Sequence, residues 1–109
     1  MVVLRRAFVY VQHTFAGILA ETDGGYTFTY DKAYLANQHS APVSRTLPLR
    51  EEMYTSNILF PFFDGLIPEG WLLSLASRNW KIDNGDRFGI LLVACRDCIG
   101  NVSIRGERV

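Results

Sequence analysis

The chain is organised around the stretch from Ile58 to Trp80, which reads ILFPFFDGLIPEGWLLSLASRNW. It is too apolar to be a solvated connector, so it must be covered by the core, by a partner, or by both. Pro61 suits the first turn of a short helix that continues to about Asp64, and Gly65 then interrupts it. The stretch therefore predicts a short helix that packs against other apolar parts of the chain.

The second half of the same stretch predicts another helix, which begins at Pro68. Glu69 lies in its first turn, where a carboxylate favours the positive helix end. The core-facing stripe of this helix is already supplied by Leu72, Leu75 and Ala76. We therefore expect Trp71 to anchor a partner, although its burial in the core is the open alternative. The expected rim of that contact consists of Phe63, Asp64, Pro68 and Glu69.

Length and charge restrict the class of protein. The 109 residues leave room for one domain with one core, which we place at residues 1–109. Eleven basic residues balance eleven acidic ones, so the chain lacks the positive excess of a protein that tracks nucleic-acid phosphates. The N-terminus does not read as a signal peptide, and no apolar run reaches the ~18 residues of a membrane span. We expect a cytoplasmic protein without direct nucleic-acid or membrane partners.

The N-terminal part of the chain has the alternation of β-strands. Strands are predicted at Ala7–Gln12, Thr14–Ala20 and Tyr26–Tyr30, where β-branched and aromatic residues alternate. The first two are close enough for a tight hairpin, and Asp23-Gly24-Gly25 is the strongest turn signal in the chain. These segments predict a three-stranded antiparallel meander.

Three weaker patterns follow the meander. Asp31–His39 is compatible with a single helical turn that Asp31 caps. Val43–Leu49 is predicted as a short edge strand, because Pro48 cannot donate to a strand ladder. The polar stretch Arg50–Asn57 is predicted as a surface loop.

The C-terminal part predicts a buried helix and a closing strand. Asp83 or Asp86 can cap a helix that continues to Ala94 and is apolar on most sides. The closing strand is predicted at Asn101–Arg105. The expected fold is α+β: one small, curled, partly barrel-like antiparallel sheet packed with three to four short helices.

Cys95 and Cys98 have the C-x-x-C spacing of redox pairs and of half a zinc site. A structural zinc would need two more ligands, and only His13 and His39 are spare. The pair follows a predicted helix C-terminus, where the dipole raises rather than lowers the pKa of a thiol. We therefore expect two reduced, inert thiols and no metal.

Other groups that could support chemistry have simpler explanations. Four acidic residues resemble acid–base candidates but read as turn residues or helix-start charges, namely Asp64, Glu69, Asp83 and Asp86. No nucleophile, convergent His or phosphate-binding loop accompanies them, so we expect neither an enzyme nor a cofactor. A third hypothesis is an RNA-binding sheet that stacks bases on Tyr26, Phe28 and Tyr30, which the neutral charge disfavours.

From the first strand to the closing strand, the sequence resembles the N-terminal subdomain of HipA-like toxin kinases. The resemblance is carried by VYVQHTFAGIL (9–19), Tyr26–Tyr30 with Asp31, Tyr34-Leu35, SRTLPLR (44–50), PFFDGLIPEGW (61–71) and RDCIGNVSI (96–104). In that family the subdomain is a small curled antiparallel sheet with helices, fused ahead of the kinase core. The resemblance therefore implies the same fold here.

The resemblance also implies a function. The family's nucleotide loop, catalytic Asp and metal ligands belong to the kinase core, so no residue here inherits those roles. A free-standing subdomain is similar to HipS, the antitoxin of three-component HipB–HipS–HipT systems, which implies a HipT-like serine/threonine kinase as direct partner. It leaves open whether a HipB-like DNA-binding protein joins a ternary complex. The alternatives are an excised N-terminal subdomain of a full-length HipA kinase and a small thiol protein, and the start at Met1 favours a natural small gene.

Overall fold

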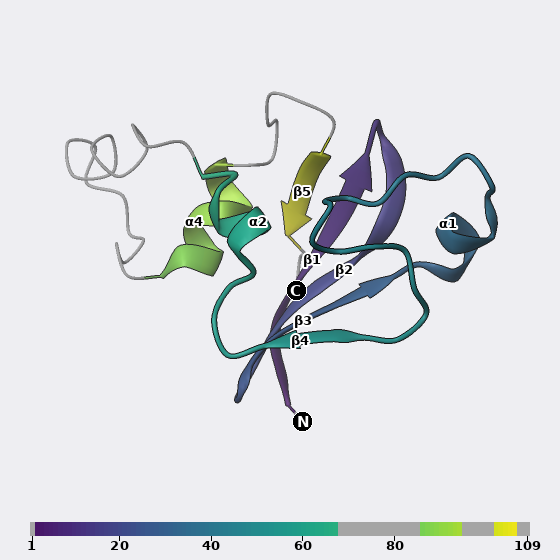
Figure 1. Ribbon diagram of the computed structural model, residues 1–109. Coiled ribbons are helices and arrows are strands. Elements are labelled where there is room, and N and C mark those ends of the chain that lie inside the picture. The colour runs from purple at the N-terminus through teal and green to yellow at the C-terminus, as the bar shows by residue number, and fades with distance from the viewer. Residues whose placement is uncertain (1, 68–85, 95–101, 107–109) are drawn as a thin grey trace.

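The computed structural model describes residues 2–67, 86–94 and 102–106, which form one antiparallel sheet with short helices (Figure 1). The elements are β1 (Val3–Val11), β2 (Thr14–Thr22), β3 (Gly25–Tyr30), α1 (Lys32–Ala36), β4 (Tyr54–Ser56), α2 (Pro61–Asp64), α4 (Arg87–Ala94) and β5 (Val102–Gly106). The five strands lie in the order β4-β3-β2-β1-β5. The predicted α+β class and the curled antiparallel sheet are confirmed, and the sheet is open rather than closed into a barrel.

The predicted meander is confirmed, because β2 pairs antiparallel with both β1 and β3. β1 and β2 are joined by a two-residue turn in which Gln12 (φ 49°) and His13 (φ 69°) both have positive φ. Such a turn matches the twist of the flanking strands. β1 begins at Val3 rather than at the predicted Ala7, since its first residues pair with the end of β2.

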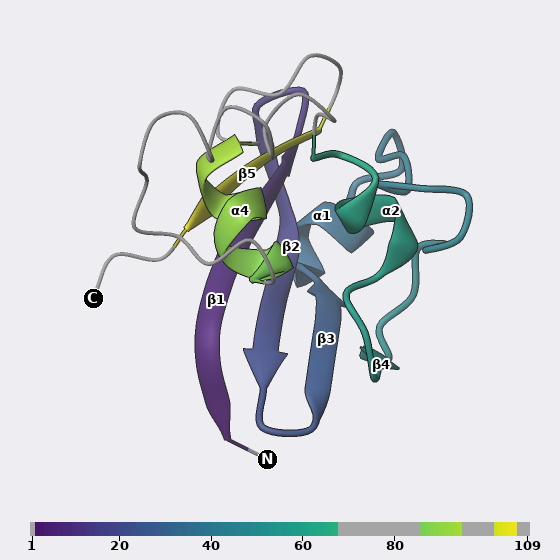
Figure 2. The same ribbon diagram turned by 90° about the vertical axis from the view of Figure 1, so that its left-hand side faces the viewer.

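The core lies between one face of the sheet and the pair α2 and α4. Phe28 of β3, Phe63 of α2 and Phe88 of α4 are all fully buried, and the rings of Phe28 and Phe63 are 5.5 Å apart. Figures 1 and 2 show α2 and α4 side by side on this face, with α1 beside the sheet away from α4. The predicted burial of the apolar segment around Phe63 and of the last helix is therefore confirmed.

The edge strand was predicted at the wrong place. β4 pairs with β3, with Tyr26 opposite Ser56 and Phe28 opposite Tyr54, so part of the predicted loop Arg50–Asn57 is the edge. The predicted strand Val43–Leu49 forms only an isolated bridge between Ser44 and Leu47.

A buried tyrosine accounts for that error. The Tyr30 hydroxyl donates to the Leu47 carbonyl and accepts from the Val43 amide at 3.0 Å. Burial raises the pKa of Tyr30 to about 12, so the hydroxyl keeps the proton that it donates. The segment 43–47 is thus held by the buried side chain of Tyr30. Strand propensity cannot predict such a contact, because it depends only on the residues of the segment itself.

The local signals for helix starts are confirmed. Asp31 caps α1 by accepting from the Tyr34 amide at 3.3 Å. Asp86, one of the two predicted caps of α4, accepts from the Gly89 amide at 3.1 Å. α2 has the predicted bounds, and β5 lies where the closing strand was predicted. The predicted helix that begins at Pro68 lies outside the described residues.

Candidate partner-binding surface

A hollow of about 480 Å³ lies where α2 begins, and we call it the α2 hollow. It is lined by Tyr26, Asn57, Ile58, Leu59, Pro61, Asp64 and Arg87. Ile58 is the most exposed large apolar side chain among the described residues, at 66 %. An exposed isoleucine beside an apolar hollow is typical of a surface that another protein covers.

An ion pair joins α2 to α4 at the side of this hollow. Arg87 Nε donates to Asp64 Oδ1 at 2.7 Å, and more than a third of each side chain is exposed to solvent (36 % and 40 %). The bond to Asp64 raises the pKa of Arg87 above its usual value. Because solvent screens the pair, its role is to set the relative position of the helices rather than to contribute much stability.

A second ion-pair network fixes the start of α4 to the sheet. The Arg5 guanidinium donates to both oxygens of Glu21, at 2.7 and 2.8 Å, and to both oxygens of Asp86, at 2.9 and 2.7 Å. It also lies 5.1 Å from the centre of the Phe88 ring. The hydrogen bonds from Arg5 hold the pKa of Asp86 below its ordinary value, although burial acts in the opposite direction. α4, and with it Arg87, therefore has a defined position over the sheet.

The structure places two of the five predicted partner-binding residues. Asp64 is partly exposed at the α2 hollow, as a rim residue should be. Phe63 is fully buried, so in this structure it supports the surface from within the core and offers no contact area. Pro68, Glu69 and Trp71 lie outside the described residues. Their contact with a partner stays a prediction.

The described groups do not form a catalytic or metal site. Asp64 and Asp86 are engaged by arginines, and Glu69 and Asp83 lie outside the described residues. Within residues 2–67, 86–94 and 102–106, no cluster of three His, Cys, Asp or Glu side chains could hold a metal ion. Cys95 and Cys98 fall outside these ranges, so the thiol hypothesis stays a prediction.

The RNA-stacking hypothesis does not fit the sheet. Phe28 and Tyr30 are 0 % and 3 % exposed, and the Tyr26 ring stacks on Phe88 at 6.1 Å. Bases cannot stack on Phe28 or Tyr30, which the core covers, and Phe88 already occupies one face of the Tyr26 ring. None of the helices in the described ranges has the length and apolar character needed to cross a bilayer.

Apart from Asp64, the residues that line the α2 hollow were not identified from the sequence as a partner-binding surface. Ile58 was counted with the buried stretch, and nothing in the local pattern of Arg87 indicated an ion pair with Asp64. The one usable signal was at Arg87, which follows the capping residue Asp86 and so lies in the first helical turn. The ion pair of Arg87 with Asp64 could not be predicted, because it depends on where α2 lies in the folded chain.

The chain has known relatives over almost its whole length. A family model described as "HipA N-terminal domain" matches residues 7–105. An uncharacterized protein of Haemophilus influenzae is 32 % identical over 105 residues, which span 96 % of this chain and 95 % of that protein. The putative kinase Y4mE of Sinorhizobium fredii is 39 % identical over 68 residues, which span 62 % of this chain and 16 % of the kinase.

A solved structure agrees with these matches. The protein described as the N-terminal domain of HipA toxin superposes with a TM-score of 0.75 at 29 % identity, over 99 % of this chain and 97 % of that one.

Proposed function

Because the chain belongs to the HipA N-terminal domain family, we propose that it is a non-catalytic antitoxin of the HipS kind, which binds a HipT-like serine/threonine kinase and neutralises it. The observation that carries this proposal is the pair of relatives. The Haemophilus protein is matched over 95 % of its length, whereas only 16 % of the putative kinase Y4mE is matched. The same domain thus occurs as a small protein and as a minor part of a kinase-sized one.

Complementation gives this pattern a physical basis. A kinase that carries the domain in the same chain must hold it against the kinase core, so a kinase without it retains a matching apolar patch. The separate domain can bind that patch in trans, provided that the contact outweighs the roughly 4–15 kcal/mol cost of association. A standard interface buries about 800 Å² per partner. That is about a ninth of this chain's 7242 Å² surface.

The α2 hollow is the surface that we assign to the kinase. It combines an exposed apolar side chain, Ile58, with an ion pair whose two charges cancel, Asp64 and Arg87. An apolar centre with a polar, neutral edge is the usual composition of a protein–protein interface. The expected partner surface is therefore apolar where it meets Ile58. A HipB-like DNA-binding protein is proposed as a third component of the complex.

The test uses the HipT-like kinase that lacks this domain. Purified chain is titrated against kinase autophosphorylation, and the affinity is measured by calorimetry. Ile58→Asp should weaken binding and neutralisation at least tenfold, because it places a charge in the apolar centre. The matched control is Leu4→Asp, since Leu4 is 58 % exposed on β1 and does not line the α2 hollow.

Three outcomes separate the parts of the proposal. Parent chain that fails to bind or inhibit the kinase contradicts the antitoxin function. Equal loss in both variants, or none in Ile58→Asp, contradicts the assigned surface alone. Saturable binding of ATP and magnesium by the isolated chain would contradict the non-catalytic role.

The same domain could also function as the N-terminal part of a full-length HipA kinase, which the partial match to Y4mE favours. The genomic sequence decides between the two. A kinase core encoded in the same reading frame supports the fused form, and a separate kinase gene beside a helix-turn-helix gene supports the antitoxin.

A further inference from the structure

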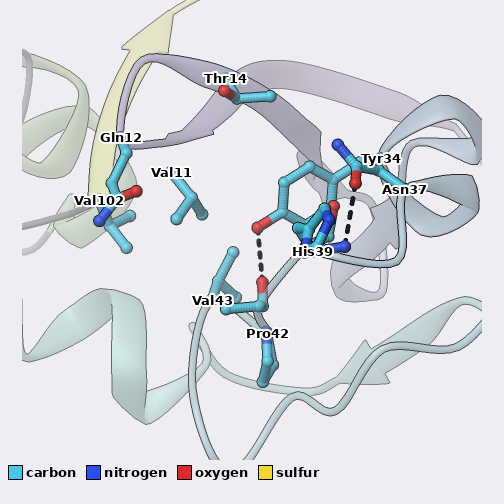
Figure 3. Close-up of a pocket in the computed structure, with 11 residues that line it drawn as sticks. Val11, Gln12, Thr14, Tyr34, Asn37, His39, Pro42, Val43 and Val102 are labelled. Atoms are coloured by element: carbon cyan, nitrogen blue, oxygen red, sulfur yellow. Dashed lines mark hydrogen bonds between the residues drawn. The ribbon is translucent and has the colours of Figure 1, made fainter.

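A second hollow lies at the opposite end of the strands from the α2 hollow, and we call it the hairpin hollow (Figure 3). The β1–β2 turn forms one side of it, and the segment after α1 forms the other. Figure 3 shows Gln12 and Thr14 on the hairpin side and Pro42 and Val43 facing them. Its volume is about 230 Å³, below the roughly 300–1,000 Å³ of pockets for drug-sized ligands and cofactors. One amino-acid side chain and its adjoining peptide group are a suitable size.

The lining is apolar beneath and polar at the edge. Val11, Val43 and Val102 supply the apolar part, and Val43 and Val102 are 6 % and 8 % exposed. The polar edge is formed by Gln12, Thr14, His39 and Ser40. The side chains of Gln12 and Thr14 form no hydrogen bond with another residue of the described part of the chain.

The wall after α1 is held in place by its own hydrogen bonds. The Tyr34 hydroxyl donates to the Ala41 carbonyl at 2.5 Å, and Tyr34 is buried. The His39 amide donates to Asn37 Oδ1 at 2.9 Å, and the Ser40 amide donates to the Asn37 carbonyl at 3.0 Å. A wall fixed before binding lowers the ordering cost that a ligand must overcome.

The opposite wall is held by an unusual turn. Gln12 and His13 both adopt the left-handed region, at φ 49° and 69°, which normally favours Gly, Asn or Asp. Local strain of this kind, where glycine would relieve it, is more common at functional positions than elsewhere. Here the turn places the Gln12 amide, which can both donate and accept, at the edge of the hollow.

The charge of the lining determines the class of occupant. Among the described residues that line the hollow, none is Asp, Glu, Lys or Arg. A charged group would lose its hydration in the hollow without gaining an opposite charge. An aliphatic group has no such hydration to lose, and it would remove the apolar surface of Val11, Val43 and Val102 from water. An amide such as Gln12 can form two hydrogen bonds with a peptide group, as neighbouring strands do.

We propose that the hairpin hollow binds an uncharged peptide segment of a partner protein, with one aliphatic side chain over Val11, Val43 and Val102 and its flanking peptide groups bonded by Gln12 and Thr14. This site lies apart from the α2 hollow. It does not depend on the antitoxin function.

The test follows backbone amide resonances of the full chain during titration with N-acetyl-leucine N-methylamide. We expect saturable shifts at the amides of residues 11–14 and 39–43, with a Kd in the range of about 1–10 mM, as one buried side chain supports. N-acetyl-glycine N-methylamide and N-acetyl-glutamate N-methylamide should bind at least fivefold more weakly. The first lacks the side chain and the second carries a charge.

A matched pair of variants locates the binding. Ala41→Phe fills the hollow from an exposed lining position, and Ala36→Phe makes the same change at an exposed position of α1 that does not line it. Ala41→Phe should lower the affinity for N-acetyl-leucine N-methylamide at least fivefold, and Ala36→Phe should leave that affinity unchanged. The proposal is overturned by equal binding of the three probes, by shifts elsewhere, or by no saturable shift up to the solubility limit. Parent-like binding in a folded Ala41→Phe protein overturns it as well.

Discussion

Arg5 and Asp86 are 81 positions apart in the chain and meet in a two-fold hydrogen-bonded ion pair, at 2.9 and 2.7 Å. Because Arg5 also binds Glu21, one guanidinium joins β1, β2 and the start of α4. Asp86 at the same time caps α4 through the Gly89 amide. The position of α4, and so of the α2 hollow, depends on this contact.

The contact predicts a dependence of stability on pH. The pKa of Asp86 is lowered in the folded protein, chiefly by hydrogen bonds from Arg5, from an ordinary value of 3.8. The stabilisation is therefore complete above about pH 4 and is lost as the pH falls through the folded pKa. Asp86→Asn should reduce the free energy of unfolding by about 1 kcal/mol at pH 7, a modest value because a third of the side chain is exposed.

Urea unfolding at pH 7, 5 and 3 checks this prediction. The difference between parent and Asp86→Asn should be the same at pH 7 and 5 and should shrink at pH 3. In an Arg5→Met background, the difference in unfolding free energy caused by Asp86→Asn should be mostly lost. Arg45→Met, at an exposed position, is the control for loss of an arginine. A difference that persists unchanged at pH 3 would show that charge on Asp86 is irrelevant.

Gly17 is predicted to be essential to the packing of β2 against β3. A Cβ atom there would lie 2.4 Å from the Thr29 carbonyl oxygen, closer than atoms can approach. Gly17→Ala should therefore destabilise the protein by about 1–3 kcal/mol, the usual cost of overpacking. Gly24→Ala is the matched control, because nothing lies within 4 Å of its Cβ position, and it should change stability by less than about 0.5 kcal/mol. Thermal unfolding of the two variants decides, and equal melting temperatures would refute the prediction.

Trp71 is predicted to be the principal anchor on the partner kinase. Truncating a tryptophan in a desolvated pocket costs about 2–4 kcal/mol, or roughly 30- to 1000-fold in affinity. Trp71→Ala should show that loss while its melting temperature stays close to that of the parent. Trp80→Ala, in the same stretch, should lower the melting temperature instead, because Trp80 closes the predicted helix and is expected to pack on the sheet. A Trp71→Ala protein that neutralises the kinase at the parent dose contradicts the anchor assignment.

The two cysteines are predicted to have no chemical role. Replacing both Cys95 and Cys98 by Ala should leave kinase neutralisation intact and reduce stability by about 1–3 kcal/mol, the usual effect of trimming buried side chains. Titration of neutralisation and denaturant unfolding measure the two quantities. Stoichiometric zinc in the parent, or loss of neutralisation in a folded double variant, would favour the thiol or metal hypothesis.

Little of the candidate surface could be predicted from the sequence. Asp64 was expected on the rim around Trp71, and of the residues that line the α2 hollow it is the one that was expected to contact a partner. Phe63 was placed on the same rim, yet it is fully buried, whereas Ile58 in the same stretch is 66 % exposed. Hydrophobicity cannot tell these two residues apart, because burial depends on which elements arrive from elsewhere in the chain.

Local sequence patterns correctly predicted the elements whose signals act over a few residues. The β1–β2–β3 meander follows from alternation and turn residues, and the starts of α1 and α4 follow from Asp31 and Asp86. Each of these depends on contacts within one turn or one hairpin, where spacing alone determines which groups meet.

The edge of the sheet and the contacts around α4 depend on long-range contacts that appear only in the folded chain. β4 displaced the predicted edge strand because the Tyr30 hydroxyl binds the backbone of Val43 and Leu47 from inside the core. The Arg5–Asp86 pair forms because the sheet and α4 bring together two charges that no local pattern connects. Hydrogen bonds and ion pairs require atoms within about 3 Å, and only the folded chain determines which distant residues come that close.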